Sequence, residues 1–128
     1  MSWDNPKEYG VYLSKGEQEV HFPIGLAFDS EQIPEGKQAP LKTLEEAAEL
    51  TEAIKDQLKG QNDPEADYES LRQHSLEEFC DVYQTLVNIA FAFGFSQTEI
   101  EDAYMKNVRR NDERGRYPSH ELEESWLG

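Results

Sequence analysis

Residues 76–93 constrain the fold most, because they have helical periodicity and are apolar around most of the helix circumference. A helix of that kind is expected to lie at the centre of a fold. Its polar residues recur at spacings of three, four and three, so they form one stripe: Glu78, Asp81, Thr85 and Asn88. Burying a carboxylate costs free energy unless it is paired. The stripe therefore predicts an enclosed polar cleft that contains Glu78 and Asp81.

A second acidic motif lies in the amphipathic run 41–58. Its residues Glu45, Glu46 and Glu49 project from one edge of a helix, because residues three or four apart share a face. If this helix packs against the central one, carboxylates from both motifs converge, and they cannot all stay ionised without a partner. A divalent cation with a preference for oxygen ligands is such a partner. The alternative is a pair of solvated acidic helix faces, which are common.

Local signals predict the ends of these two helices. Pro40 suits the first turn of the earlier helix, and Gly60 suits the position just past its end. The spacing of Ser75 and Glu78 predicts a capping box at the start of the central helix, which gives Glu78 a competing role. Gly94 is expected to stop this helix.

Further helices are predicted on either side of the central one. Asp63 is expected to cap a short helix that Pro64 opens and that continues to about residue 72. Ser96 and Glu99 predict a second capping box, for a helix through about residue 111 that Gly115 ends. A last short helix is expected over residues 121–127. The predicted fold is thus an all-α bundle of about four to five helices.

Residues 1–40 differ from the rest, since they hold four of the six prolines and four of the eight glycines. The alternation of apolar residues over positions 20–28 predicts an extended segment. A hairpin is compatible with residues 11–17, and Pro23 excludes a central strand. An arm laid across the helices or a neighbouring subunit explains the composition equally well. We expect one domain with an arm (1–39), a helical core (40–117) and a tail (118–128).

The composition limits partners and location. With 37% hydrophobic and 30% charged residues, the chain is expected to have a modest core that a homodimer or a dimer of dimers completes. The net charge of −15 disfavours nucleic acid as a general partner. No run reaches the roughly 18 apolar residues of a membrane helix, no secretory signal is recognisable, and Cys80 is the single cysteine. A cytoplasmic protein without membrane contact is expected.

Basic residues are concentrated in one place. Five of the twelve lysines and arginines lie between positions 106 and 116: Lys106, Arg109, Arg110, Arg114 and Arg116. Such a stretch in an acidic chain is suited to a compact polyanion, for example a triphosphate. The alternative is that these residues complement the C-terminus of a helix and pair with neighbouring acids.

The order of these motifs resembles a known family. The chain reads E-E-x-x-E, 28 intervening residues, E-x-x-D and then K-N-V-R-R. This is similar to the all-α nucleoside triphosphate pyrophosphohydrolases of the MazG type, relatives of dimeric dUTPases and phosphoribosyl-ATP pyrophosphohydrolases, over residues 41–117. The gap of 28 residues is at the long end for that family. Tyr104 stands where many relatives carry asparagine.

The resemblance implies roles for the candidate residues. Glu46, Glu49, Glu78 and Asp81 would bind Mg²⁺, for which Mn²⁺ can substitute. Glu45 would orient a water molecule or hydrogen-bond to a ligand, so that the first motif is the catalytic one. The phosphates of a nucleoside triphosphate substrate would contact Lys106, Arg109 and Arg110.

The chemistry agrees with that implication. Carboxylates supply the hard ligands that Mg²⁺ prefers, the metal polarises phosphorus and activates water, and basic side chains balance the charge of a leaving pyrophosphate. The absence of an E-x-x-H motif disfavours di-iron and zinc sites. We therefore expect a hydrolase that cleaves between the α and β phosphates, with a non-catalytic acidic dimerisation or regulatory module as the alternative.

Overall fold

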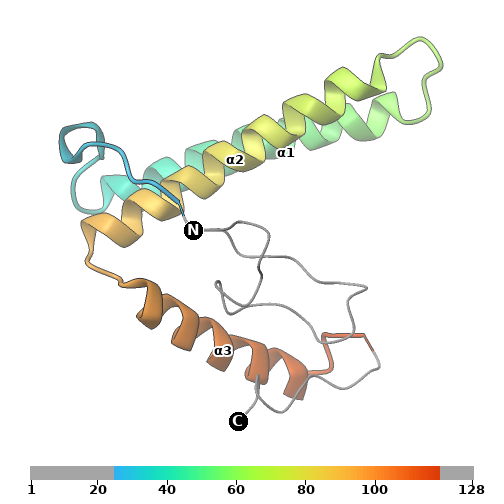
Figure 1. Ribbon diagram of the computed structural model, residues 1–128. Helices are drawn as coiled ribbons and strands as arrows, with labels where there is room; N and C mark the ends of the chain where they lie inside the picture. Colours follow the sequence, from blue (N-terminus) through green and yellow to red (C-terminus); the bar gives the residue numbers. More distant parts are fainter. Residues whose placement is uncertain (1–24, 119–128) are drawn as a thin grey trace. The chain divides into compact units, whose positions relative to one another are not determined.

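The computed structural model describes residues 25–118, and within them it contains helices and no strand (Figure 1). The chain divides into two compact units, one of which is Gly25–Gly94. The described part of the other unit is residues 95–118, and each unit is treated separately below. The all-α fold class is thus confirmed. Three α-helices are described, rather than the predicted four to five, and the expected helix 121–127 lies outside the described residues.

The unit Gly25–Gly94 is built on an antiparallel pair of long helices. Helices α1 (Gln38–Gly60) and α2 (Tyr68–Ala92) lie side by side along their length and are joined by a short loop, as Figure 1 shows. Lys37 is the N-cap of α1 and directly follows Gly36, whose φ of 55° is in the left-handed region that favours glycine. Pro40 lies in the first turn of α1, as predicted.

Gly60 is the last residue of α1 and not the first residue beyond it, so the predicted boundary was wrong by one position. The reason is the packing of the two helices. A Cβ atom at position 60 would overlap the side chain of Leu71 in α2, and Gly60 is buried. The absence of a side chain at position 60 leaves room for the end of the Leu71 side chain at the loop end of the pair.

Helix α2 is one continuous helix where the sequence predicted two. Its N-cap is Asp67, whose side chain accepts hydrogen bonds from the backbone N–H of Ser70 (3.2 Å) and from the Ser70 hydroxyl (2.7 Å). Asp63, the predicted cap, instead accepts a bond from the Glu65 backbone N–H in the loop at 2.9 Å. No proline or glycine interrupts residues 65–93, so nothing stops the helix before Ser75.

Ser75 is therefore inside α2, and the predicted capping box of Ser75 and Glu78 does not form. The Ser75 hydroxyl donates to the backbone oxygen of Leu71, one turn earlier, at 3.3 Å. A residue inside a helix offers no unsatisfied N-terminal backbone N–H for Glu78 to accept from. This removes the role that competed with the proposed site. The C-terminal prediction is confirmed, because α2 ends just before Gly94, which has a φ of 72°.

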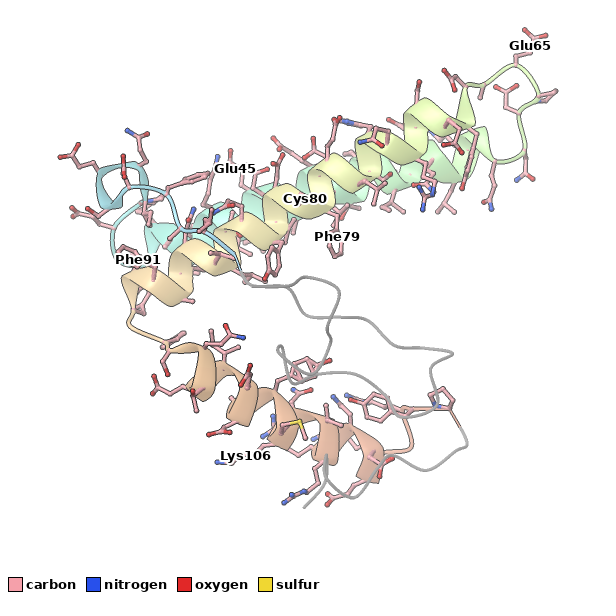
Figure 2. All side chains as sticks on the ribbon, viewed as in Figure 1. Glu45, Glu65, Phe79, Cys80, Phe91 and Lys106 are labelled. Atoms are coloured by element: carbon pink, nitrogen blue, oxygen red, sulfur yellow. The ribbon has the colours of Figure 1, made fainter. Side chains whose placement is uncertain are left out.

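The polar stripe of α2 is only partly enclosed, since Asp81 is exposed, so the predicted enclosed cleft does not contain Asp81. Several apolar residues of α2 also face outward, because the described residues of this unit cover only part of the helix surface. Thr85 and Asn88 are buried, whereas Leu76, Phe79 and Leu86 are exposed. In Figure 2 the ring of Phe79 projects away from the helix pair. Within residues 25–94, the apolar face of α2 is thus available for a further packing partner.

The segment before α1 also packs on α2. It contains one short 3₁₀ helix, η2 (Ser30–Gln32), and the buried residue Ile33. Gly25 lies so close to Val87 that an added Cβ would overlap the Val87 side chain. Residues 25–29, the described end of the extended segment predicted over positions 20–28, carry neither helix nor strand. Positions 20–24 and the predicted hairpin at 11–17 lie outside the described residues.

In the second unit, helix α3 (Gln97–Glu113) has the predicted ends. The Ser96 hydroxyl accepts from the Glu99 backbone N–H at 3.1 Å, and the Ser96 backbone N–H donates to Oε1 of Glu99 at 2.9 Å. These reciprocal bonds are a capping box, and they lower the pKa of Glu99. Gly115, with a φ of 69°, follows the helix end.

Candidate metal centre

Three of the predicted ligands come together between α1 and α2. Glu46 and Glu49 lie one turn apart on α1, and Glu78 faces them from α2. One carboxylate oxygen from each residue lies within 4.8 Å of the other two. Among the described residues, this trio, which we call the carboxylate cluster, brings both acidic motifs together. The convergence expected from helical spacing is present for these three residues.

Two of the three side chains in the carboxylate cluster are largely shielded from solvent. The side chain of Glu78 is 15% exposed and that of Glu46 is 13% exposed, whereas Glu49 is exposed. Oε2 of Glu78 is buried and has no hydrogen-bond partner. A buried polar atom in this state costs about 1–3 kcal/mol, and more when it carries charge. The oxygen is therefore in place to accept a ligand that the protein itself does not supply.

The neighbouring carboxylates of the cluster raise the pKa of Glu49. A side-chain hydrogen bond with Glu46 raises the pKa of Glu49, and the negative charge of Glu46 acts in the same direction. Burial and the charges of Glu78 and Glu45 add to this increase. A raised carboxyl pKa means that Glu49 takes up a proton at a higher pH than an isolated glutamate does.

Two basic side chains at the edge of the cluster were not predicted as part of it. Nζ of Lys42 lies 3.3 Å from Oε1 of Glu46 and 3.3 Å from Oε1 of Glu45. These two carboxylates, Glu45 first, raise the pKa of Lys42. Nε2 of His74 lies 3.9 Å from Oε1 of Glu78. Both could have been found from the sequence, because each is three or four positions from an acidic residue.

Asp81 and Glu45 lie beside the carboxylate cluster. Asp81 is exposed, and with Glu46 and Lys42 it lines a hollow of about 250 Å³ that adjoins the cluster. Glu45 is exposed at the surface, where its partner is Lys42 (Figure 2). The structure thus gathers Glu46, Glu49 and Glu78, with Asp81 one turn beyond Glu78 on the same helix.

The predicted phosphate-binding residues are on α3, in the other unit. Lys106, Arg109 and Arg110 are exposed and, at spacings of three and four, share one face of the helix. Arg110 lies in the last turn, where a cation also complements the helix dipole. Figure 2 labels Lys106 on this helix. The positions of these three basic residues on α3 are compatible with phosphate binding and also with the alternative, in which they complement the dipole at the C-terminus of the helix.

The cluster suits a small hard cation. Mg²⁺ binds oxygen at about 2.0–2.1 Å, which places neighbouring ligands about 3 Å apart and opposite ones about 4.2 Å apart. The three carboxylate oxygens lie within 4.8 Å of one another, which is close to these separations. All three donors are carboxylates, which are ligands of Mg²⁺, Mn²⁺ and Ca²⁺ rather than of soft metals. The donor set therefore fits the metal implied by the sequence.

Comparisons with protein-family models, curated proteins and solved structures found no match. The likeness to the pyrophosphohydrolases accordingly rests on the acidic motifs, their order and the basic stretch. Within the described residues, no helix has the length and apolar character needed to cross a membrane.

Proposed function

We propose that the protein is a Mg²⁺-dependent nucleotide pyrophosphohydrolase that cleaves a nucleoside triphosphate between the α and β phosphates. The products are the nucleoside monophosphate and pyrophosphate. The observation that carries the proposal is the carboxylate cluster, in which Oε2 of Glu78 is buried without a hydrogen-bond partner. Two acidic motifs from distant parts of the chain meet at that point.

The metal would be held by Glu46, Glu49 and Glu78, with Asp81 as a further ligand from the same face of α2. When bound, Mg²⁺ would neutralise phosphate charge and make the α-phosphorus more electrophilic. Mn²⁺ has the same ligand preference and can substitute. Cation binding would also favour the ionised form of Glu49, because a nearby positive charge opposes the repulsion from Glu46.

Glu45 and Lys42 would act at the exposed rim of the cluster. Glu45 is positioned by its ion pair with Lys42 and is open to solvent, so it would orient the attacking water and accept its proton. Lys42 holds a positive charge beside Glu46 and would shift toward substrate phosphate when a metal takes over that carboxylate. Lys106, Arg109 and Arg110 would bind the phosphates and the leaving pyrophosphate.

A second copy of the chain would complete the fold. Leu50, Ile54, Leu76 and Phe79 line an apolar hollow of about 270 Å³ on the helix pair, and Phe79 is 60% exposed. Exposed apolar surface of this kind is typical of an association site. A homodimer, or a dimer of dimers, would bury this face and give α2 the central position that its composition predicts, within the fuller bundle of four to five helices.

The alternative is a non-catalytic acidic module that associates through the same apolar face. The ion pairs of Lys42 with Glu45 and Glu46 favour it, because they neutralise part of the acidic face without a metal. In that case the cluster would hold a structural cation or face water.

Pyrophosphate release separates the two functions. The wild-type protein is incubated with the common ribo- and deoxyribonucleoside triphosphates in Mg²⁺, in Mn²⁺ and in EDTA. We expect pyrophosphate and monophosphate in equal amounts, only with metal, from at least one nucleotide. Glu49→Gln and Asp81→Asn should abolish this, whereas Glu65→Gln, a matched charge change in the exposed loop (Figure 2), should not. Absence of turnover with every nucleotide and either metal would favour the non-catalytic module.

A further inference from the structure

A hollow beside the carboxylate cluster has one wall from outside the helix pair. Phe28 and Gln32 come from the segment that precedes α1, and together with Asn88 of α2 they line the hollow. Lys42, Glu46 and Asp81 also line it. Because Glu46 belongs both to this lining and to the carboxylate cluster, the two sites are contiguous.

Hydrogen bonds fix the segment against α2. The Phe28 backbone N–H donates to Oδ1 of Asn88 at 3.0 Å. Nε2 of Gln84 donates to the Leu26 backbone oxygen at 2.7 Å and to the same Oδ1 of Asn88 at 3.0 Å. The bonds from Phe28 to Asn88 and from Gln84 to Leu26 join residues about sixty positions apart, so the wall that carries Phe28 is held in place before any ligand arrives.

The hollow has a charged part, lined by the helices, and an uncharged part, lined by the segment before α1. The charged side chains Lys42, Glu46 and Asp81 belong to the helices, next to the carboxylate cluster. The segment contributes an aromatic ring that is 50% exposed, Phe28, and the uncharged amide of Gln32. The accepting oxygen of Asn88 is occupied by Phe28 and Gln84, so this residue has only its NH₂ group to offer a ligand.

We propose that this hollow binds the nucleoside portion of the substrate, with the nucleobase stacked on Phe28 and its polar edge on the amides of Gln32 and Asn88. The proposal rests on the function proposed above, which places the phosphates at the carboxylate cluster. A volume of about 250 Å³ is below the roughly 300–1,000 Å³ of pockets that enclose whole drug-sized ligands. The hollow therefore takes the base and sugar, while the phosphates extend toward Glu46.

Phe28→Ala tests the stacking contact by affinity rather than turnover alone. Binding of α,β-imido nucleoside triphosphates of the five common bases is measured by calorimetry with Mg²⁺, alongside inorganic tripolyphosphate. Base stacking on an aromatic side chain contributes enough to change affinity by about 5- to 150-fold. We expect Phe28→Ala to weaken nucleotide binding by that factor and to leave tripolyphosphate binding unchanged. Phe28→Tyr should bind like the wild type.

Leu26→Ala is the matched control. Leu26 lies on the same segment, is 88% exposed and uses its backbone oxygen for the bond to Gln84, so the substitution keeps the segment attached. It should not alter nucleotide affinity. Circular dichroism checks that each variant retains its helix content.

The outcomes separate this inference from the proposed function. If the wild type hydrolyses nucleotides and Phe28→Ala binds and cleaves them normally, the nucleoside site is elsewhere and the function stands. If nucleotides bind to the wild type without being hydrolysed, and Phe28→Ala weakens nucleotide binding but not tripolyphosphate binding, the proposed function fails and the nucleoside site stands. Equal weakening of nucleotide and tripolyphosphate binding, or no nucleotide binding by the wild type, overturns the inference.

Discussion

Substituting Glu78 by Gln should stabilise the protein without metal and remove its response to metal. The change keeps the shape of the side chain and replaces a carboxylate by a neutral amide. That amide can donate to the neighbouring carboxylates, which Oε2 of Glu78 cannot do. The same substitution removes a ligand from the carboxylate cluster, so the effects with and without Mg²⁺ have opposite signs.

The magnitude follows from the geometry of the cluster. Charges on Glu46 and Glu78 at the 4.8 Å limit of their separation repel by about 0.9 kcal/mol at the dielectric constant of water and about 3.5 kcal/mol at an effective value of about 20. Both side chains are largely buried, so we expect Glu78→Gln to raise the free energy of unfolding by about 1–3 kcal/mol in EDTA. For a chain of this length, that is roughly 3–6 °C in Tm per kcal/mol.

Metal should cancel or reverse the difference in stability between the variant and the wild type. A ligand at 100 times its Kd stabilises a folded protein by about 2.7 kcal/mol. The wild type should gain that amount at saturating Mg²⁺, and Glu78→Gln should gain little. Thermal unfolding is followed by circular dichroism at pH 7.5 in EDTA and in Mg²⁺, with Glu65→Gln as the control.

A variant that is less stable than the wild type in EDTA and responds equally to Mg²⁺ would refute the reasoning. Glu78 would then be a structural residue with a favourable environment. Loss of stability in EDTA together with loss of the Mg²⁺ response would instead indicate that Glu78 has a partner of its own besides the metal.

Three further predictions test other parts of the structure. Because the pKa of Glu49 is raised in the fold, its contribution to stability is present below the ordinary glutamate pKa and is lost as pH rises through the raised value. In chemical unfolding in EDTA, the stability of Glu49→Gln relative to the wild type should therefore increase over that pH range. A stability difference that stays constant with pH would contradict the coupling. Gly60→Ala should cost up to about 1 kcal/mol, because its Cβ requires the end of the Leu71 side chain to move. Adding Leu71→Ala should cancel part of that cost in a double-variant unfolding experiment, and a cost that Leu71→Ala leaves unchanged would contradict the overlap. Phe79→Glu should lower the mass measured by light scattering from dimer to monomer, and an unchanged mass would exclude this face as the interface.

Features that depend on neighbouring residues in the chain could be predicted from the sequence. The capping box of Ser96 and Glu99 and the left-handed glycines at 94 and 115 are of this kind, because their geometry involves only a few consecutive residues. Ser75 and Glu78 show the limit of such signals. The same spacing also occurs inside a helix. It marks a helix start only where a residue such as proline or glycine interrupts the helix before it.

The candidate site was partly predictable for the same reason. Helical spacing puts Glu46 and Glu49 on one face, but only the packing of α1 on α2 determines that Glu78 meets them closely while Asp81 lines the neighbouring hollow. Phe28 could not be assigned to the site, because its contact with Asn88 joins residues sixty positions apart. Sequence periodicity carries no information about such contacts.

The most direct test of the account is the position of the metal. Crystals grown with Mn²⁺ and an α,β-imido nucleoside triphosphate should give an anomalous difference peak at the manganese absorption edge. We predict a peak within about 2.0–2.3 Å of carboxylate oxygens of Glu46, Glu49 and Glu78. Nucleotide bound with no peak at these three residues, or a peak only at other side chains, would contradict the proposed metal centre.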